Sequence, residues 1–216
     1  MERLTKAGII RIVSKAAQGR SARKAIDWTA LAAAERLGQL QQVITQNVDA
    51  LHQAAGSKNV IDLHGRLDSV RCMKCGAPMT RVRMDELLHE LNPNIKKDAN
   101  HEFTPDGDAE LEAAADFRIP ACPTCSGVLK PDVVFFGESV PQSRVENAMA
   151  RLDEADALLV AGTSLTVNSG LRFARRAARA GKPIIIVNIG ETKADELATA
   201  KIEANTSQVL ERLFID

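Results

Sequence analysis

The chain has 216 residues, and its 28 basic and 28 acidic side chains give a formal net charge of zero. A chain of this length encloses one hydrophobic core, with room for a small appendage, and an apolar fraction of 45% is ordinary for a folded soluble protein. The balanced charge argues against a nucleic-acid binder. Because we find no long apolar stretch and no signal peptide, we expect no membrane association and a cytoplasmic location.

The first predicted strand covers residues 43–46 and ends in polar side chains. An amide and a carboxylate lie where this strand leaves its sheet, within the sequence Thr45, Gln46, Asn47, Val48 and Asp49. Such residues bind ligands at strand ends, but they also form ordinary Asn or Asp turns. His64 follows, just before a cysteine-containing segment, and a lone histidine is more often structural than catalytic.

All four cysteines fall into two pairs of the same spacing, Cys72 with Cys75 and Cys122 with Cys125. Two C-x-x-C turns supply four thiolates for a tetrahedral Zn²⁺ site. A disulfide framework is unexpected in an intracellular chain, and a redox site needs only one pair. Four thiolates leave no open position for a catalytic water, so the predicted zinc is structural.

The segment between the pairs predicts a small module inserted into a larger domain. Residues 84–91 have helical periodicity, which Asn92 and Pro93 end, and residues 96–108 are polar with a turn signal. We therefore assign residues 71–130 to a zinc-binding module.

The rest of the chain has an α/β pattern. After an apolar run at residues 132–136, a helix near 145–152 precedes a strand at 157–161. A second helix at 169–180 ends at Gly181 and Pro183 before a strand at 184–187. Strands and helices that alternate with short connections predict a Rossmann-like, doubly wound parallel sheet. We assign it to residues 31–70 and 131–216, and we expect residues 1–30 to form an atypical N-terminal segment.

Ligands of such sheets bind at the carboxyl ends of the strands. Besides the residues around Asn47, this rule selects two groups of residues, Gly162-Thr163-Ser164 and Asn188-Ile189-Gly190. Taken alone, the first group is a weak signal, because most Gly-Thr-Ser turns are merely helix caps.

In chain order, these motifs resemble the sirtuin family, the NAD-dependent protein deacylases. The resemblance extends from about residue 31 to residue 210, and it is strongest to the class II branch. The motifs that carry it are Thr45 to Asp49, Leu63-His64-Gly65, the two cysteine pairs, Lys130 to Glu138, Gly162 to Leu165, and Asn188 to Gly190.

The resemblance implies an enzyme that removes acyl groups from lysine, with NAD⁺ consumed as co-substrate and nicotinamide and O-acyl-ADP-ribose as products. His64 would be the general base, and Asn47 and Asp49 would act catalytically around the nicotinamide. The implied NAD⁺-binding residues are Gln46, Asn47, Val48, Asp49, Gly162, Thr163, Ser164, Asn188, Ile189, Gly190 and Thr206. Acyl-lysine peptides would pair, as an added strand, with the segment from Val133 to Glu138.

The N-terminal segment departs from the family pattern. Sirtuins begin with a strand followed by a Gly-Ala-Gly-x-Ser loop that holds the NAD pyrophosphate, and residues 5–10 match this only faintly. We therefore expect the first strand and its loop to be missing, which would expose a sheet edge. An alternative function follows: a weak or inactive sirtuin remnant that acts as a zinc-bearing binding protein.

Overall fold

The computed structural model describes residues 9–13, 28–93 and 117–215, and its contacts divide the chain into two units. The sheet unit contains described residues 9–13, 28–65 and 134–215. The cysteine unit contains described residues 66–93 and 117–133. In the described part of the chain, no helix is both long and apolar enough to span a bilayer.

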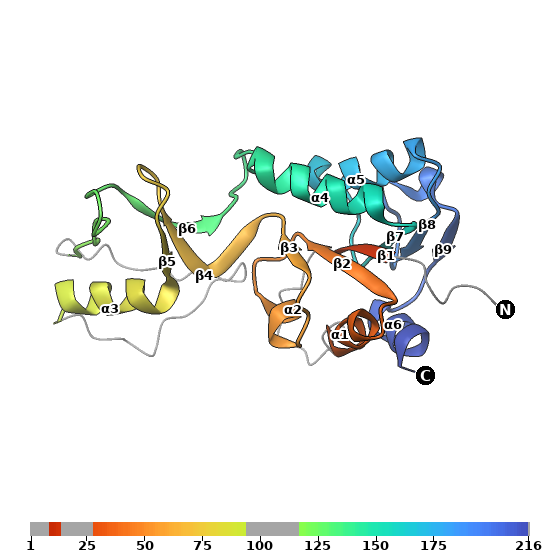
Figure 1. Cartoon of the computed structure of the whole chain (residues 1–216), viewed down its shortest axis with the longest axis horizontal. Helices are drawn as coiled ribbons and strands as arrows, with labels where there is room; N and C mark the ends of the chain where they lie inside the picture. Colours follow the sequence, from red (N-terminus) through yellow and green to blue (C-terminus); the bar gives the residue numbers. More distant parts are fainter. Residues whose placement is uncertain (1–8, 14–27, 94–116, 216) are drawn as a thin grey trace. The chain divides into compact units, whose positions relative to one another are not determined.

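The sheet unit is built on six parallel strands in the order β3-β2-β1-β7-β8-β9 (Figure 1). The strands are β1 (Ile9–Val13), β2 (Leu40–Thr45), β3 (Val60–Asp62), β7 (Ala157–Ala161), β8 (Ile184–Val187) and β9 (Ala200–Ile202). The chain order reverses between β1 and β7, which makes this the Rossmann arrangement with its switch point beside β1. The predicted doubly wound fold is confirmed.

The expectation that the first strand is missing was wrong. Ile9–Val13 forms β1, and it pairs along its length with β2 on one side and β7 on the other. Neither neighbour is therefore left as a sheet edge. Four of the five residues of β1 are β-branched and favour a strand, but a run this short does not show that the strand is central; the two parallel partners decide that. The loop after β1, where the family has its glycine-rich sequence, lies outside the described residues.

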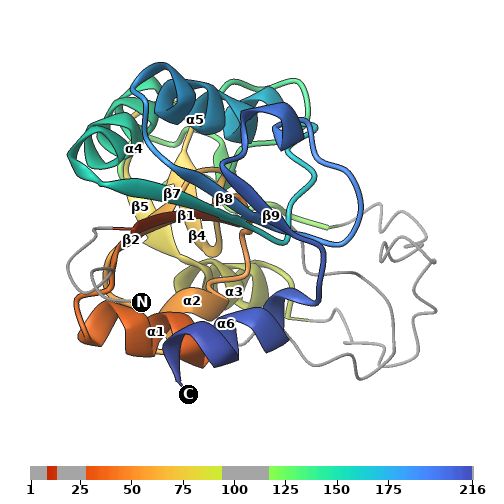
Figure 2. The same ribbon diagram turned by 90° about the vertical axis from the view of Figure 1, so that its right-hand side faces the viewer.

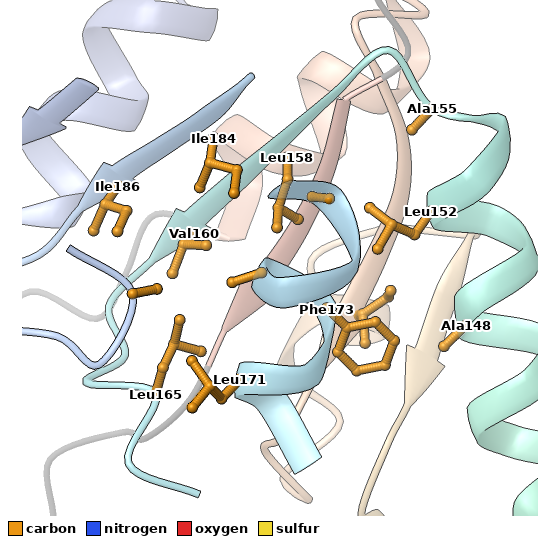
Figure 3. Packing of buried hydrophobic residues seen from close by; sticks show 14 of the residues in the cluster. Ala148, Leu152, Ala155, Leu158, Val160, Leu165, Leu171, Phe173, Ile184 and Ile186 are labelled. Carbon is orange, nitrogen blue, oxygen red and sulfur yellow. The ribbon is translucent and has the colours of Figure 1, made fainter. Parts of the chain in front are cut away.

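Helices cover both faces of the six-stranded sheet (Figure 2). One face packs on α4 (Gln142–Glu154) and α5 (Asn168–Arg179), in a core that includes Phe173 and Leu152 (Figure 3). The other face packs on α1 (Trp28–Arg36) and α6 (Thr206–Phe214), which contact each other. The described part of the unit also contains two short helical segments, α2 (Leu51–Ala54) and the 3₁₀ turn η1 (Asp195–Leu197).

The described residues of the cysteine unit form a three-stranded sheet of order β5-β4-β6 and one helix. Its strands are β4 (Gly65–Cys72), β5 (Pro78–Thr80) and β6 (Leu129–Val133), and the helix is α3 (Arg81–Leu91). Thr80 begins the helix because its Oγ1 accepts a hydrogen bond from the amide of Arg83. The polar loop predicted at residues 96–108 lies outside the described residues.

Most predicted boundaries lie within a few residues of the observed ones, and the strands at 157–161 and 184–187 agree in full. The apolar run at 132–136 differs. Only its first two residues belong to a strand, β6, while Phe135 and Phe136 are 51% and 97% exposed. The hydrophobicity of this run therefore does not mark a core strand.

Candidate functional site

The last residues of all six parallel strands are in register. Asp62, Thr45, Val13, Ala161, Val187 and Ile202 are consecutive partners across the sheet. The residues that follow these strands therefore emerge along one edge of the sheet. This brings together, from distant parts of the sequence, the loops at 46–49, 63–64, 162–166 and 188–190.

His64 is half-buried at this edge, and both of its ring nitrogens have partners. Nδ1 lies 3.2 Å from the backbone carbonyl oxygen of Gln46, and Nε2 lies 2.8 Å from Oγ of Ser169. Burial lowers the pKa of His64 below its ordinary value of 6.5, and the charges of Arg144 and Arg172 lower the pKa further. The backbone hydrogen bond to Gln46 opposes them. The net effect favours a neutral imidazole at neutral pH, as a general base requires.

Asn47 and Asp49 take different positions in the loop after β2. Asn47 is 9% exposed, and its backbone N–H donates to Oγ1 of Thr45 across 3.1 Å. Asp49 is exposed, and its Oδ1 accepts a hydrogen bond from the amide of Leu51 at the start of α2. Asp49 thus forms the kind of Asp turn that the sequence left open, while Val48 between them is half-buried.

The loops after β7 and β8 are shaped by glycines with positive φ, at Gly162 and Gly190. Oγ1 of Thr163 accepts from the amide of Leu165, so this buried hydroxyl holds the turn together. The exposed hydroxyl of Ser164 lies 2.7 Å from that of Thr166.

The remaining predicted NAD⁺-binding residues lie in the loop after β8 and at the start of α6. Asn188 donates its side-chain amide to the carbonyl oxygens of Ile189 and Gly190 in its own loop, and the Ile189 side chain is 69% exposed. Thr206 is the first residue of α6 and is half-buried.

The four cysteines of the other unit converge without forming a disulfide. Sγ of Cys72 lies 3.5 Å from that of Cys125, Sγ of Cys75 lies 3.8 Å from that of Cys122, and all four sulfurs lie within 4.8 Å of one another. Four sulfurs at about 2.3 Å from a tetrahedral zinc are about 3.8 Å apart, so this set fits Zn²⁺.

Local backbone geometry favours the metal-binding thiolate form of one of these sulfurs, that of Cys72. The amides of Lys74 and Cys75 point at Sγ of Cys72 from 3.4 and 3.5 Å, and these hydrogen bonds lower the pKa of Cys72 to about 6. A lowered pKa favours the thiolate that zinc binds. Gly127 leaves space for the cluster, because a Cβ there would lie 2.9 Å from Sγ of Cys72.

Sequence reasoning missed the residues that hold His64. Ser169 and Gly170 lie in the first turn of α5, and Arg144 lies on α4, with its guanidinium 3.5 Å from the carbonyl oxygen of Leu63. In the sequence, Ser169 and Gly170 have the pattern of an ordinary helix start. No local signal marks them, because their role depends on the placement of α5 beside the end of β3.

The comparison with known families agrees with the geometry. The profile of the Sir2 family matches residues 6–169, which includes β1 and all the loops described above except that after β8. The chain belongs to the Sir2 family. Curated relatives of this Sir2-family chain are named NAD-dependent protein deacetylases. One from Xanthomonas campestris pv. campestris (strain 8004) is 57% identical over 183 residues, covering 84% of this chain and 62% of the relative. One from Bradyrhizobium diazoefficiens, "NAD-dependent protein deacetylase 2", is 50% identical over 184 residues, covering 84% and 67%.

Solved structures show the same relationship. The structure "Sir2 bound to acetylated peptide" is 30% identical with a TM-score of 0.67, over 86% of this chain and 67% of that one. A second, "Sir2-p53 peptide-NAD+", is 24% identical with a TM-score of 0.72, over 97% and 93%, and it shows the shared fold. The match with this Sir2-family chain covers 62% of the length of the Xanthomonas campestris relative, about three fifths.

Proposed function

We propose that this chain is an NAD⁺-dependent protein-lysine deacylase whose reaction takes place at the carboxyl edge of the six-stranded sheet. The observation that carries the proposal is the environment of His64. Its ring is half-buried and biased toward the neutral form, and it lies at the strand ends where Rossmann sheets bind nucleotides. The deacetylase names of relatives at 50–57% identity point to the same chemistry.

In this proposal, the acyl oxygen of the acyl-lysine displaces nicotinamide from C1′ of the ribose and forms an imidate. His64 then removes a proton from a ribose hydroxyl, which attacks the imidate carbon; the lysine amine leaves, and water completes O-acyl-ADP-ribose. Gln46 contacts the ribose, and Asn47 and Asp49 act near the nicotinamide. The loops that contain Ser164 and Asn188 face the adenosine half. The zinc cluster takes no part in the chemistry, since four thiolates complete its coordination.

We also propose that the acyl-lysine peptide binds beside the segment from Val133 to Glu138. Two observations favour this placement: the backbone amide of Val134 donates to the carbonyl oxygen of His64 across 2.8 Å, and Phe136, two residues further along the chain, is 97% exposed. Phe135 and Glu138 close a turn by two reciprocal hydrogen bonds. Strand addition would therefore use the part of the segment before this turn.

The test is direct. The purified chain is incubated with NAD⁺ and an acetyl-lysine peptide, and nicotinamide and O-acetyl-ADP-ribose are measured by mass spectrometry, with reactions lacking NAD⁺ or peptide as controls. Equal amounts of both products, abolished by His64→Ala, are the expected result. Calorimetry with NAD⁺ separates the alternative: a remnant without the pyrophosphate loop would neither bind NAD⁺ in the micromolar range nor release nicotinamide.

A further inference from the structure

The hydroxyl of Ser169 contacts the proposed base directly. Ser169 is 8% exposed in the first turn of α5, and its Oγ lies 2.8 Å from Nε2 of His64. This contact joins residues that are far apart in the sequence. The same hydroxyl lies 3.3 Å from the side-chain amide nitrogen of Gln46.

The direction of these hydrogen bonds follows from what each group can do. A backbone carbonyl only accepts, so the ring nitrogen that faces the Gln46 carbonyl, Nδ1, carries the proton of the neutral imidazole. Nε2 is then an acceptor, and Ser169 must donate to it. The amide of Gln46 donates in turn to Oγ of Ser169, which leaves the hydroxyl proton to point at the ring.

We propose that Ser169 is a positioning residue for His64. Its hydroxyl holds the ring as the Nδ1–H tautomer, with the lone pair of Nε2 directed to the sheet edge, until a substrate hydroxyl takes the place of the serine hydroxyl. The inference rests on the proposed function, because it assigns His64 the role of base. Hydrogen bonds on both ring nitrogens also fix the orientation of the ring.

Gly170 supplies the space for this arrangement. A Cβ at position 170 would lie 2.9 Å from Oε1 and 3.1 Å from Nε2 of Gln46, so any larger residue would push that side chain away from Ser169. Ser169 and Gly170 therefore act together. The serine contacts the base, and the glycine leaves space for the Gln46 side chain that orients the serine hydroxyl.

The charged groups that face His64 act in the same direction as Ser169. Arg144 on α4 and Arg172 on α5 both disfavour the imidazolium, and burial does so more strongly. A hydrogen bond donated to Nε2 also favours the neutral ring. Loss of the Ser169 hydroxyl should therefore raise the pKa of His64.

The test combines kinetics with NMR of the ring nitrogens of His64 in the full chain. For Ser169→Ala we expect kcat to fall about five- to ten-fold, because one hydrogen bond is lost. The KM for the peptide should be nearly unchanged. The acid limb of the pH profile should move to higher pH, and the tautomer should become mixed. Ser169→Thr, which keeps the hydroxyl, should restore the tautomer and the pH profile.

Two further variants separate positioning from simple destabilisation. Ser57→Ala removes an equally buried hydroxyl, 5% exposed and without a hydrogen-bond partner among the described residues, and should leave titration and rate unchanged. Gly170→Ala should shift the titration in the same direction as Ser169→Ala while the helix stays intact, since alanine favours helices.

The NMR readout needs neither NAD⁺ nor turnover. If the parent chain releases no nicotinamide but Ser169→Ala still changes the tautomer and the pKa of His64, the proposed function fails and the positioning role stands. If the ring of Ser169→Ala keeps the parent tautomer and titrates at the parent pH or below, the positioning role is overturned whatever the activity.

Discussion

Gly127→Ala should weaken zinc binding through steric contact, since Gly127 does not need the left-handed φ that would strain an alanine. A Cβ at position 127 would lie 2.7 Å from Cβ of Lys74, 2.9 Å from Sγ of Cys72 and 3.2 Å from Sγ of Cys125. Since such atoms normally pack at about 3.5–4.0 Å, the Cys72 sulfur must move by roughly half an ångström. Zinc–sulfur distances hold to within about 0.2 Å, so a shift of this size distorts the site.

We expect zinc affinity to fall about 10- to 100-fold, the usual effect of changes around a metal site, which corresponds to about 1.4–2.7 kcal/mol. The measurement is competition for zinc against a chromophoric chelator, with circular dichroism at saturating zinc to confirm that the chain is folded. Parent-like zinc affinity in Gly127→Ala would refute the steric argument.

Gly76→Ala is the matched control. Gly76 has φ of +72°, and a Cβ there meets nothing within 4 Å. Alanine should therefore cost about 1–2 kcal/mol of backbone strain while leaving the sulfurs in place. If this variant loses as much zinc affinity as Gly127→Ala, backbone strain rather than sulfur displacement controls the site.

Four other outcomes follow from the sheet unit. His64→Ala should lower the deacylation rate by about 10²–10⁴-fold with little change in thermal unfolding, and a parent-like rate would remove His64 from the mechanism. Because the pKa of His64 is lowered, the base stays neutral as pH falls to 6.5, so the acid limb of the rate profile should lie below pH 6.5; half-maximal activity above that value would contradict the pKa direction. Phe173→Ala, at a fully buried position, should reduce the free energy of unfolding in urea by about 3–5 kcal/mol. Phe136→Ala, at a 97% exposed position, should change it by less than about 0.5 kcal/mol, and equal losses would contradict the assignment of the core.

Local chemistry in the sequence was enough to predict the zinc site and most of the sheet. The spacing of Cys72 with Cys75 and Cys122 with Cys125 specifies two turns that each direct two sulfurs to one centre, and these sulfurs do meet in the fold. The strand at 184–187 was readable because a β-branched run follows a helix stop at Gly181 and Pro183. These signals are local, since each depends on residues a few positions apart.

Tertiary contacts decided what local pattern could not. The β-branched residues of segment 9–13 favour a strand, but its central place in the sheet comes from β2 and β7, which supply parallel partners on both sides. Likewise, the motif before the zinc module marked His64 as a candidate, but the sequence did not pair it with Ser169. That contact exists because the end of β3 and the start of α5 reach the same edge of the sheet, where the hydroxyl comes within 2.8 Å of the ring.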